Sequence, residues 1–204
     1  YRRTCEYELA IADYDKAIAV DPQNNWLYME RGQVYKEAED FEQALSDYNT
    51  AIALSTESNS VFIDMAYGYR AKLYLRIKAY EKALADYTRL IQRDPTSSLA
   101  YASRGNAYLE MEASERALAD YNKALELSPG DAYLYVYRGN VYARQGQYEQ
   151  AIKEYTLALR EFVAQRTAPL DAGRTMADVA QKLVPQMVGP GALPEGLRLA
   201  EHCM

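Results

Sequence analysis

Histidine, cysteine and paired carboxylates carry out most side-chain catalysis, and this 204-residue sequence offers few of them in useful combinations. The single histidine, His202, is third from the C-terminal end, which argues against a histidine-dependent triad or general base. The two cysteines, Cys5 and Cys203, match no metal-ligand or disulfide framework. The sequence also lacks the P-loop, GxGxxG, HExxH and GxSxG motifs. We therefore expect no enzyme, with no catalytic residue, no cofactor and no metal site.

Two ladders of charged residues recur along the chain and could form repeated ion pairs. The arginines are Arg31, Arg70, Arg104 and Arg138, and the acidic residues, each directly before a tyrosine, are Asp13, Asp47, Asp86, Asp120 and Glu154. We expect each arginine to pair with an acidic residue of a neighbouring helix and so to orient successive helices. The alternative is a cationic stripe that binds a ligand.

An internal repeat defines the elements that position these ladders. The tyrosines that follow the acidic ladder are Tyr14, Tyr48, Tyr87, Tyr121 and Tyr155, and they are separated by 34, 39, 34 and 34 residues. Each lies in a copy of one segment, such as "ALADYNKALELSP" (117–129). Upstream of four copies the sequence reads "YMERGQVY" (28–35), "YGYRAKLY" (67–74), "YASRGNAY" (101–108) and "YVYRGNVY" (135–142). Each repeat therefore predicts two helices.

Small residues recur where the two helices of a repeat would cross. They are Gly32, Ala71, Gly105 and Gly139 in the first helix, and Ala10, Ala44, Ala83, Ala117 and Ala151 in the second. Small side chains allow helix axes to approach to about 8–10 Å. Pro22, Pro95 and Pro129 should end the second helix, whereas Thr56 and Val163 replace that proline in two copies.

This pattern closely resembles the tetratricopeptide repeat (TPR), whose period is also about 34 residues. The resemblance covers residues 1 to about 163. It implies an all-α fold, a right-handed superhelical solenoid of TPR helix hairpins. Stacked hairpins of this kind bury a continuous core that a single hairpin could not bury.

Aligned on the repeat, the chain divides into seven segments. They are the C-terminal part of a truncated unit at 1–24, complete units at 25–58, 64–97, 98–131 and 132–165, an insertion at 59–63 and an atypical tail at 166–204. The insertion should form a longer loop or an extra helical turn, or else a bulge that contacts a partner. In the tail, residues 175–188 could form a capping helix, and the alternatives are disorder or docking in a binding groove.

The first residues align with the end of a first helix. The stretch "YRRTCEY" (1–7) matches "YARQGQY" (142–148), which places Cys5 in a turn and predicts that the chain is a fragment. Helix residues 7–20 would then lack a neighbour, and their apolar face could associate with another copy.

Composition narrows the class of partner. The formal charge of −6 and a pI near 5.0 argue against a nucleic-acid or anionic membrane partner. No apolar run approaches the length of a membrane span and no targeting signal opens the chain, so we expect a soluble, cytoplasmic protein.

The TPR resemblance implies that the first helices line a concave groove that binds a peptide or a partner helix. Mapped onto this sequence, the groove residues are Trp26, Met29, Gln33, Lys36, Met65, Lys72, Arg76, Leu99, Ala102, Asn106, Leu109, Tyr133, Asn140 and Arg144. Lys72 and Arg76 should form the most positive spot, and the amides should bond an extended peptide backbone. The alternative is that these residues are merely solvated helix faces.

A carboxylate clamp of the cochaperone type is not expected, because Met29 and Gln33 stand at the Lys and Asn places of that motif, and Tyr69 at the next Asn place. The sequence therefore predicts a protein-interaction scaffold or adaptor. The alternatives are a self-assembling module that uses the open N-terminal repeat, and a regulatory domain of a larger enzyme.

Overall fold

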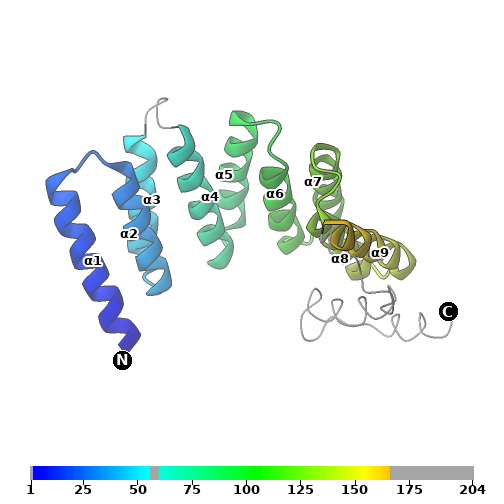
Figure 1. Cartoon of the computed structure of the whole chain (residues 1–204), viewed down its shortest axis with the longest axis horizontal. Coiled ribbons are helices and arrows are strands. Elements are labelled where there is room, and N and C mark those ends of the chain that lie inside the picture. The colour runs from blue at the N-terminus through cyan, green and yellow to red at the C-terminus, as the bar shows by residue number, and fades with distance from the viewer. Residues whose placement is uncertain (1, 56–59, 166–204) are drawn as a thin grey trace. The chain divides into compact units, whose positions relative to one another are not determined.

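The computed structural model describes residues 2–55 and 60–165, and within these ranges the chain forms nine α-helices and no strand. The helices are α1 (Arg2–Val20), α2 (Asn25–Glu37), α3 (Phe41–Leu54), α4 (Ser60–Arg76), α5 (Tyr80–Arg93), α6 (Ser98–Glu110), α7 (Ser114–Leu127), α8 (Ala132–Arg144) and α9 (Tyr148–Gln165), as Figure 1 shows. They fall into two compact units, α1–α6 and α7–α9. The all-α hairpin architecture predicted from the repeat is confirmed.

Polar caps and turn residues set the helix boundaries. Side chains of Asp40, Ser97 and Asp131 accept hydrogen bonds from backbone N–H groups in the first turns of α3, α6 and α8. The turn inside each complete hairpin contains one residue with positive φ. These residues are Glu39, Lys78, Glu112 and Gly146. Only one of the four is a glycine, so three hairpins hold an L-residue in a conformation that glycine adopts more easily.

The prolines end second helices as predicted. Helices α1, α5 and α7 stop two residues before Pro22, Pro95 and Pro129. The Tyr28 hydroxyl also donates a hydrogen bond to the Pro22 carbonyl, and Tyr135 does the same to Pro129. Where a valine replaces the proline, α9 runs on to residue 165 and is 18 residues long, against 14 for α5 and α7.

The five-residue insertion contributes mainly to a helix. Helix α4 begins at Ser60 and has 17 residues, whereas α2 has 13. Residues 60–63 therefore form an extra turn at the start of α4, which was one of the predicted alternatives. Residues 56–59 and the tail, including the predicted capping helix at 175–188, lie outside the described residues.

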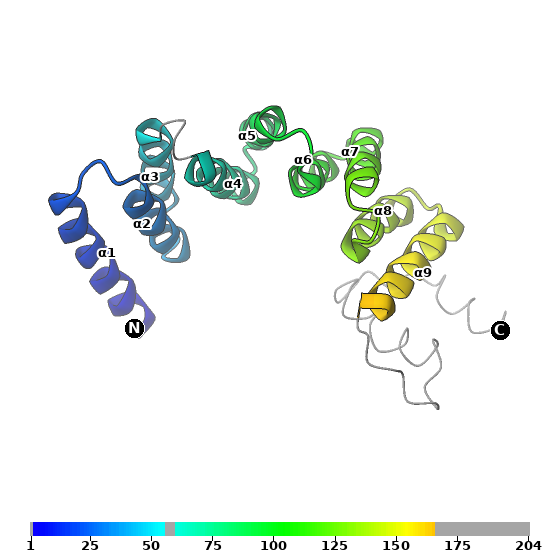
Figure 2. The same cartoon turned by 45° about the horizontal axis from the view of Figure 1, so that its top comes forward.

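The predicted turn near Cys5 is wrong, because α1 is one continuous helix from Arg2 to Val20. In the complete hairpins the aligned residue has positive φ, which costs an L-residue on the order of 1–2 kcal/mol. Packing of a first helix against the second offsets that cost in those hairpins. No described helix packs on this side of α1 (Figures 1 and 2), so a continuous helix is the more stable local conformation.

In each complete hairpin of the first unit, the core forms around the repeated tyrosine and alanine of the second helix. Tyr48 packs with Ala44 and Leu73, and Tyr87 packs with Ala71 and Ala83. A Cβ atom added to Gly32 would lie 2.8 Å from the Tyr48 ring, and in the second unit one added to Gly139 would lie 2.7 Å from the Tyr155 ring. This confirms that a small residue permits the close approach of the two helices.

Candidate protein-binding surface

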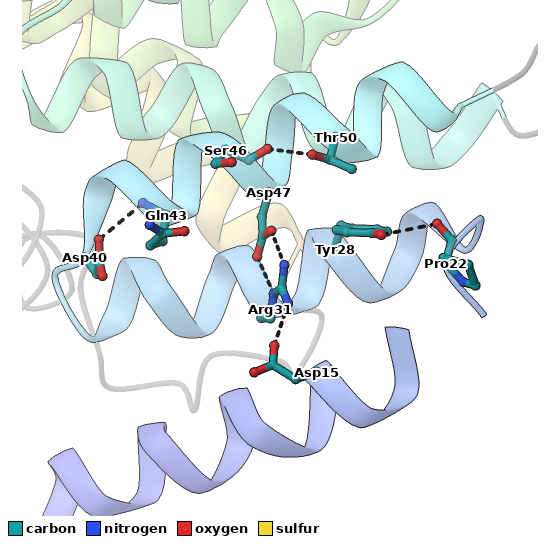
Figure 3. Close-up of polar contacts among 9 residues, drawn as sticks. All are labelled: Asp15, Pro22, Tyr28, Arg31, Asp40, Gln43, Ser46, Asp47 and Thr50. Atoms are coloured by element: carbon teal, nitrogen blue, oxygen red, sulfur yellow. Dashed lines mark hydrogen bonds and ion pairs between the residues drawn. The ribbon is translucent and has the colours of Figure 1, made fainter. Parts of the chain in front are cut away.

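The arginine ladder is an internal clamp between helices. Arg31 on α2 makes a forked contact with Asp47 on α3, with Nε 2.8 Å from Oδ2 and Nη2 2.6 Å from Oδ1. Its remaining Nη1 lies 2.5 Å from Oδ1 of Asp15 on α1 (Figure 3). One guanidinium therefore joins the second helix of its own hairpin to the second helix before it.

The same geometry recurs in both units. Arg70 forks onto Asp86 and donates to Asn49, and Arg138 forks onto Glu154 and donates to Asn122. Arg104 donates from Nη1 to Thr88, the aligned partner on the preceding helix. The predicted ion pairs are thus confirmed for three arginines. The second partner of each arginine, on the preceding helix, was not predicted. The sequence indicates it, because a polar residue directly follows each repeated tyrosine.

Two tyrosines flank the guanidinium groups of Arg31, Arg70 and Arg104. The Cζ atom of Arg31 lies 5.6 Å from the Tyr28 ring centroid and 5.8 Å from the Tyr35 centroid, and Arg70 is similarly placed between Tyr67 and Tyr74. The Asp47 side chain is 5% exposed and that of Arg31 is 18% exposed. Hydrogen bonding to Asp47 raises the pKa of Arg31 further above its usual range, so this charge is permanent. The alternative of a ligand-binding cationic stripe is therefore wrong for these residues.

The predicted groove amides also take part in hairpin packing. The Tyr48 hydroxyl donates to Oε1 of Gln33 at 2.7 Å, and the Tyr155 hydroxyl donates to Oδ1 of Asn140 at 2.8 Å. Lys36 Nζ also donates to Gln33 Oε1. Gln33 Oε1 therefore accepts two hydrogen bonds within the hairpin and Asn140 Oδ1 accepts one, which reduces what these two amide oxygens can offer a ligand.

Three predicted groove residues are buried and cannot contact a ligand directly. Met29 is 1% exposed and packs with Ala51 and Ala66, while Ala102 and Leu109 are also buried. For Met29 the reason is that α2 contacts α4, so this side chain fills the space between the two helices. For these three residues the prediction of ligand contact is corrected.

The remaining predicted residues of the first unit lie on α2, α4 and α6. Trp26, Met65 and Leu99 are exposed apolar side chains, and Leu99 is 75% exposed. Asn106 is half-buried on α6. In the second unit, Tyr133 and Arg144 are exposed on α8, and the Tyr133 ring meets Phe162 edge-on at 5.1 Å.

The cations of the first unit differ in how far they are neutralised. Arg76 lies 2.6 Å from Glu39 and stacks over Phe41, and Lys36 lies 2.9 Å from Glu37. The hydrogen bond from Lys36 lowers the pKa of Glu37 below its ordinary value. Lys72 is exposed and makes no ion pair or hydrogen bond within residues 2–55 and 60–165. Among the predicted groove cations Lys36, Lys72 and Arg76, Lys72 is therefore the one most available to an incoming anion.

Other kinds of site find no support in the part of the chain that the structure describes. Those residues contain no group of three histidine, cysteine, aspartate or glutamate side chains placed to hold a metal ion. Among the described helices, none is both long and apolar enough to cross a membrane.

Family models cover most of the helical region. Models described as tetratricopeptide repeat match residues 29–98, 98–131 and 120–153, and one described as TPR repeat matches residues 6–39. No curated protein matches the sequence.

Solved structures show the same fold at low sequence identity. A crystal structure of MamA is 23% identical, covers 82% of this chain and 95% of its own, and has a TM-score of 0.67. MamA from Desulfovibrio magneticus RS-1 is 20% identical, covers 79% and 88%, and also has a TM-score of 0.67. YrrB, described as a TPR protein with an unusual peptide-binding site, is 22% identical, covers 88% and 85%, and has a TM-score of 0.56. At these identities the similarity establishes the fold alone.

Proposed function

The chain belongs to the tetratricopeptide repeat family and is a protein-interaction scaffold, and we propose that it binds an extended peptide or a partner helix on the exposed face of α2, α4 and α6. We propose further that it does so without catalysis. The observation that carries this proposal lies on α4, where the exposed apolar side chain of Met65 is followed two turns later on the same helix face by Lys72, which has no ion pair among the described residues.

The chemistry of this face favours a ligand that is apolar and carries an acidic group. Trp26, Met65 and Leu99 offer apolar area, which supplies most of the affinity in protein interfaces. Lys72 offers a charge that would orient the ligand more than it would strengthen binding, because an exposed ion pair contributes under about 1 kcal/mol. The net charge of −6 supports a protein partner over a nucleic acid.

The test is affinity capture from a cell extract with the full chain and matched variants. Leu99→Asp removes an apolar contact, and Lys72→Glu reverses the available charge. Arg89→Glu is the control, because Arg89 is exposed on α5, outside the proposed face, and the charge change equals that of Lys72→Glu.

We expect a partner that the wild type and Arg89→Glu capture and that Leu99→Asp and Lys72→Glu lose. Helical circular dichroism should be unchanged in all four proteins. Equal capture by every variant would exclude α2, α4 and α6 as the binding face.

A further inference from the structure

One aligned position of the first helices is buried in α2, α6 and α8 but open in α4. The buried residues at this position are Met29, Ala102 and Val136. In the first unit, Met29 packs against Ala51 of α3 and Ala66 of α4 and so fills the space between neighbouring helices. The aligned residue of α4 is Gly68, which has no side chain and is only half-buried.

The space beside Gly68 is not filled from neighbouring helices either. A Cβ atom added to Gly68 would meet no atom within 4 Å among residues 2–55 and 60–165. On α6 the aligned neighbour is Ala100, which is as small as its counterpart Ala66. On α5 it is Leu90, which packs against the core of α4, α5 and α6 and still leaves Gly68 uncovered. No described side chain therefore takes the place that Met29 fills between α2 and α4.

This open space lies between an apolar group and a cation on one face of α4. Met65 is three residues before Gly68 and Lys72 is four residues after it, and these spacings place all three on the same side of the helix. Met65 is exposed, and Lys72 is exposed with no ion pair within residues 2–55 and 60–165. An apolar side chain placed beside Gly68 would therefore lie near Met65, with a positive charge one helical turn away.

We propose that the space beside Gly68 receives one apolar side chain of the peptide ligand, and that Lys72 pairs with a carboxylate of the same peptide. This inference rests on the function proposed above and names the ligand class of that face. Because Met29 fills the aligned space in α2, the incoming side chain should be about the size of methionine or leucine.

The spacing along α4 specifies the ligand further. At a rise of about 1.5 Å per residue, Gly68 and Lys72 are separated by about 6 Å along the helix axis. Residues two apart in an extended peptide are separated by a similar distance, about 6.6 Å, and their side chains point to the same side. The ligand class is therefore an extended peptide in which leucine or methionine stands two residues from aspartate or glutamate.

The probe for this inference is a phage-displayed library of random dodecapeptides, selected on the immobilised full chain. Gly68→Met is the test variant, because it gives α4 the side chain that α2 carries at the aligned position. Ala85→Met is the matched control, since Ala85 is exposed on α5, outside the proposed face. We expect the wild type and Ala85→Met to enrich peptides with the predicted spacing, and Gly68→Met to enrich none of them.

An enriched peptide, labelled with fluorescein, then measures the contact by fluorescence anisotropy. We expect Gly68→Met to bind it at least tenfold more weakly than the wild type does. Replacing the leucine or methionine of the peptide by alanine should weaken binding to the wild type at least tenfold, but should change binding to Gly68→Met less than twofold. Replacing the acidic residue by its amide should weaken binding to the wild type several-fold and should not weaken binding to Lys72→Glu.

Stability measurements separate a filled space from a damaged fold. Gly68→Met should keep or raise the melting temperature, because glycine is a poor helix former and the new side chain enters open space. A lower melting temperature would show that the space is too small for such a side chain and would overturn the proposal. Gly68→Ala adds a single methyl group and should weaken peptide binding less than Gly68→Met does.

The variants also separate this inference from the proposed function. If Leu99→Asp lost the enriched peptides while Gly68→Met bound them as tightly as the wild type, this inference would be wrong and the proposed binding face would stand. If Leu99→Asp and Lys72→Glu both bound them as tightly as the wild type, the proposed face itself would be wrong. Enrichment of no peptide by the wild type would overturn this inference as well.

Discussion

Helices α1 and α3 share one sequence pattern but differ in what covers them, and the difference separates two properties that the repeat encodes. Both form helices, so the pattern is sufficient for local structure. Only α3 buries its tyrosine and pairs its aspartate with an arginine, because only α3 has a first helix, α2, against that face. The ion pair and the buried tyrosine are therefore products of the hairpin rather than of the helix.

The largest effect is expected when each of the two aligned aspartates, Asp47 and Asp13, is replaced by alanine. Asp47→Ala leaves the largely buried Arg31 without its forked partner, and we expect a loss of roughly 3–5 kcal/mol in the free energy of unfolding. Asp13→Ala removes only an exposed pair with Lys16 and should change stability by under about 0.5 kcal/mol. Urea denaturation followed by circular dichroism measures both. Equal losses would mean that the clamp adds nothing to the hairpin.

The same contrast of covered and uncovered positions applies to two methionines on first helices. Met29→Ala should lose roughly 2–5 kcal/mol, because Met29 fills the seam beside Ala51 and Ala66. Met65→Ala should cost little stability, since Met65 is exposed, but should weaken capture of a partner on the proposed face. A large stability loss in Met65→Ala would place this side chain in the core and remove it from the candidate surface.

Much of this architecture followed from the sequence, because each repeat specifies its own neighbours. A 34-residue period with matched small residues, tyrosines and charges predicts hairpins, and it predicted the pairing of Arg31 with Asp47. The fork between arginine and carboxylate recurs in three hairpins, so the pattern reports this contact reliably.

The features that the sequence did not predict arise where local context differs between copies. Cys5 does not adopt a turn, because the packing that would stabilise positive φ is not supplied there. Met29 stands at a position that faces the ligand in the family pattern, but its long side chain fills the space between α2 and α4. The amides of Gln33 and Asn140 were expected to bind a ligand. Their tyrosine partners lie about fifteen residues away in the sequence and become neighbours only in the folded hairpin.

Buried tyrosines predict how stability depends on alkaline pH. Burial raises the pKa of Tyr87 from its usual value of 10.0 to about 12. A raised folded-state pKa stabilises the fold fully below pH 10, and this contribution is lost as the pH rises from about 10 through 12. The loss amounts to roughly 2–3 kcal/mol, at 1.36 kcal/mol for each pKa unit.

Urea denaturation at intervals between pH 9 and 12 measures this dependence, and Tyr87→Phe should reduce the slope. Tyr14→Phe should change it less, because Tyr14 is only half-buried on the uncovered face of α1. Identical slopes for the wild type and Tyr87→Phe would show that this hydroxyl does not control alkaline unfolding.

The smallest expected effect tests why α1 lacks a turn. Gly146 has φ of 74°, and a Cβ added to it would meet no atom within 4 Å, so Gly146→Ala tests backbone strain without a steric clash. We expect it to lose about 1 kcal/mol, and the reverse change, Lys78→Gly at φ 59°, to gain a little under that amount. The two effects should have opposite signs in thermal denaturation. If Gly146→Ala were neutral, positive φ would cost too little to explain why α1 continues through Cys5 as a helix. The missing packing against α1 would then be the sole cause.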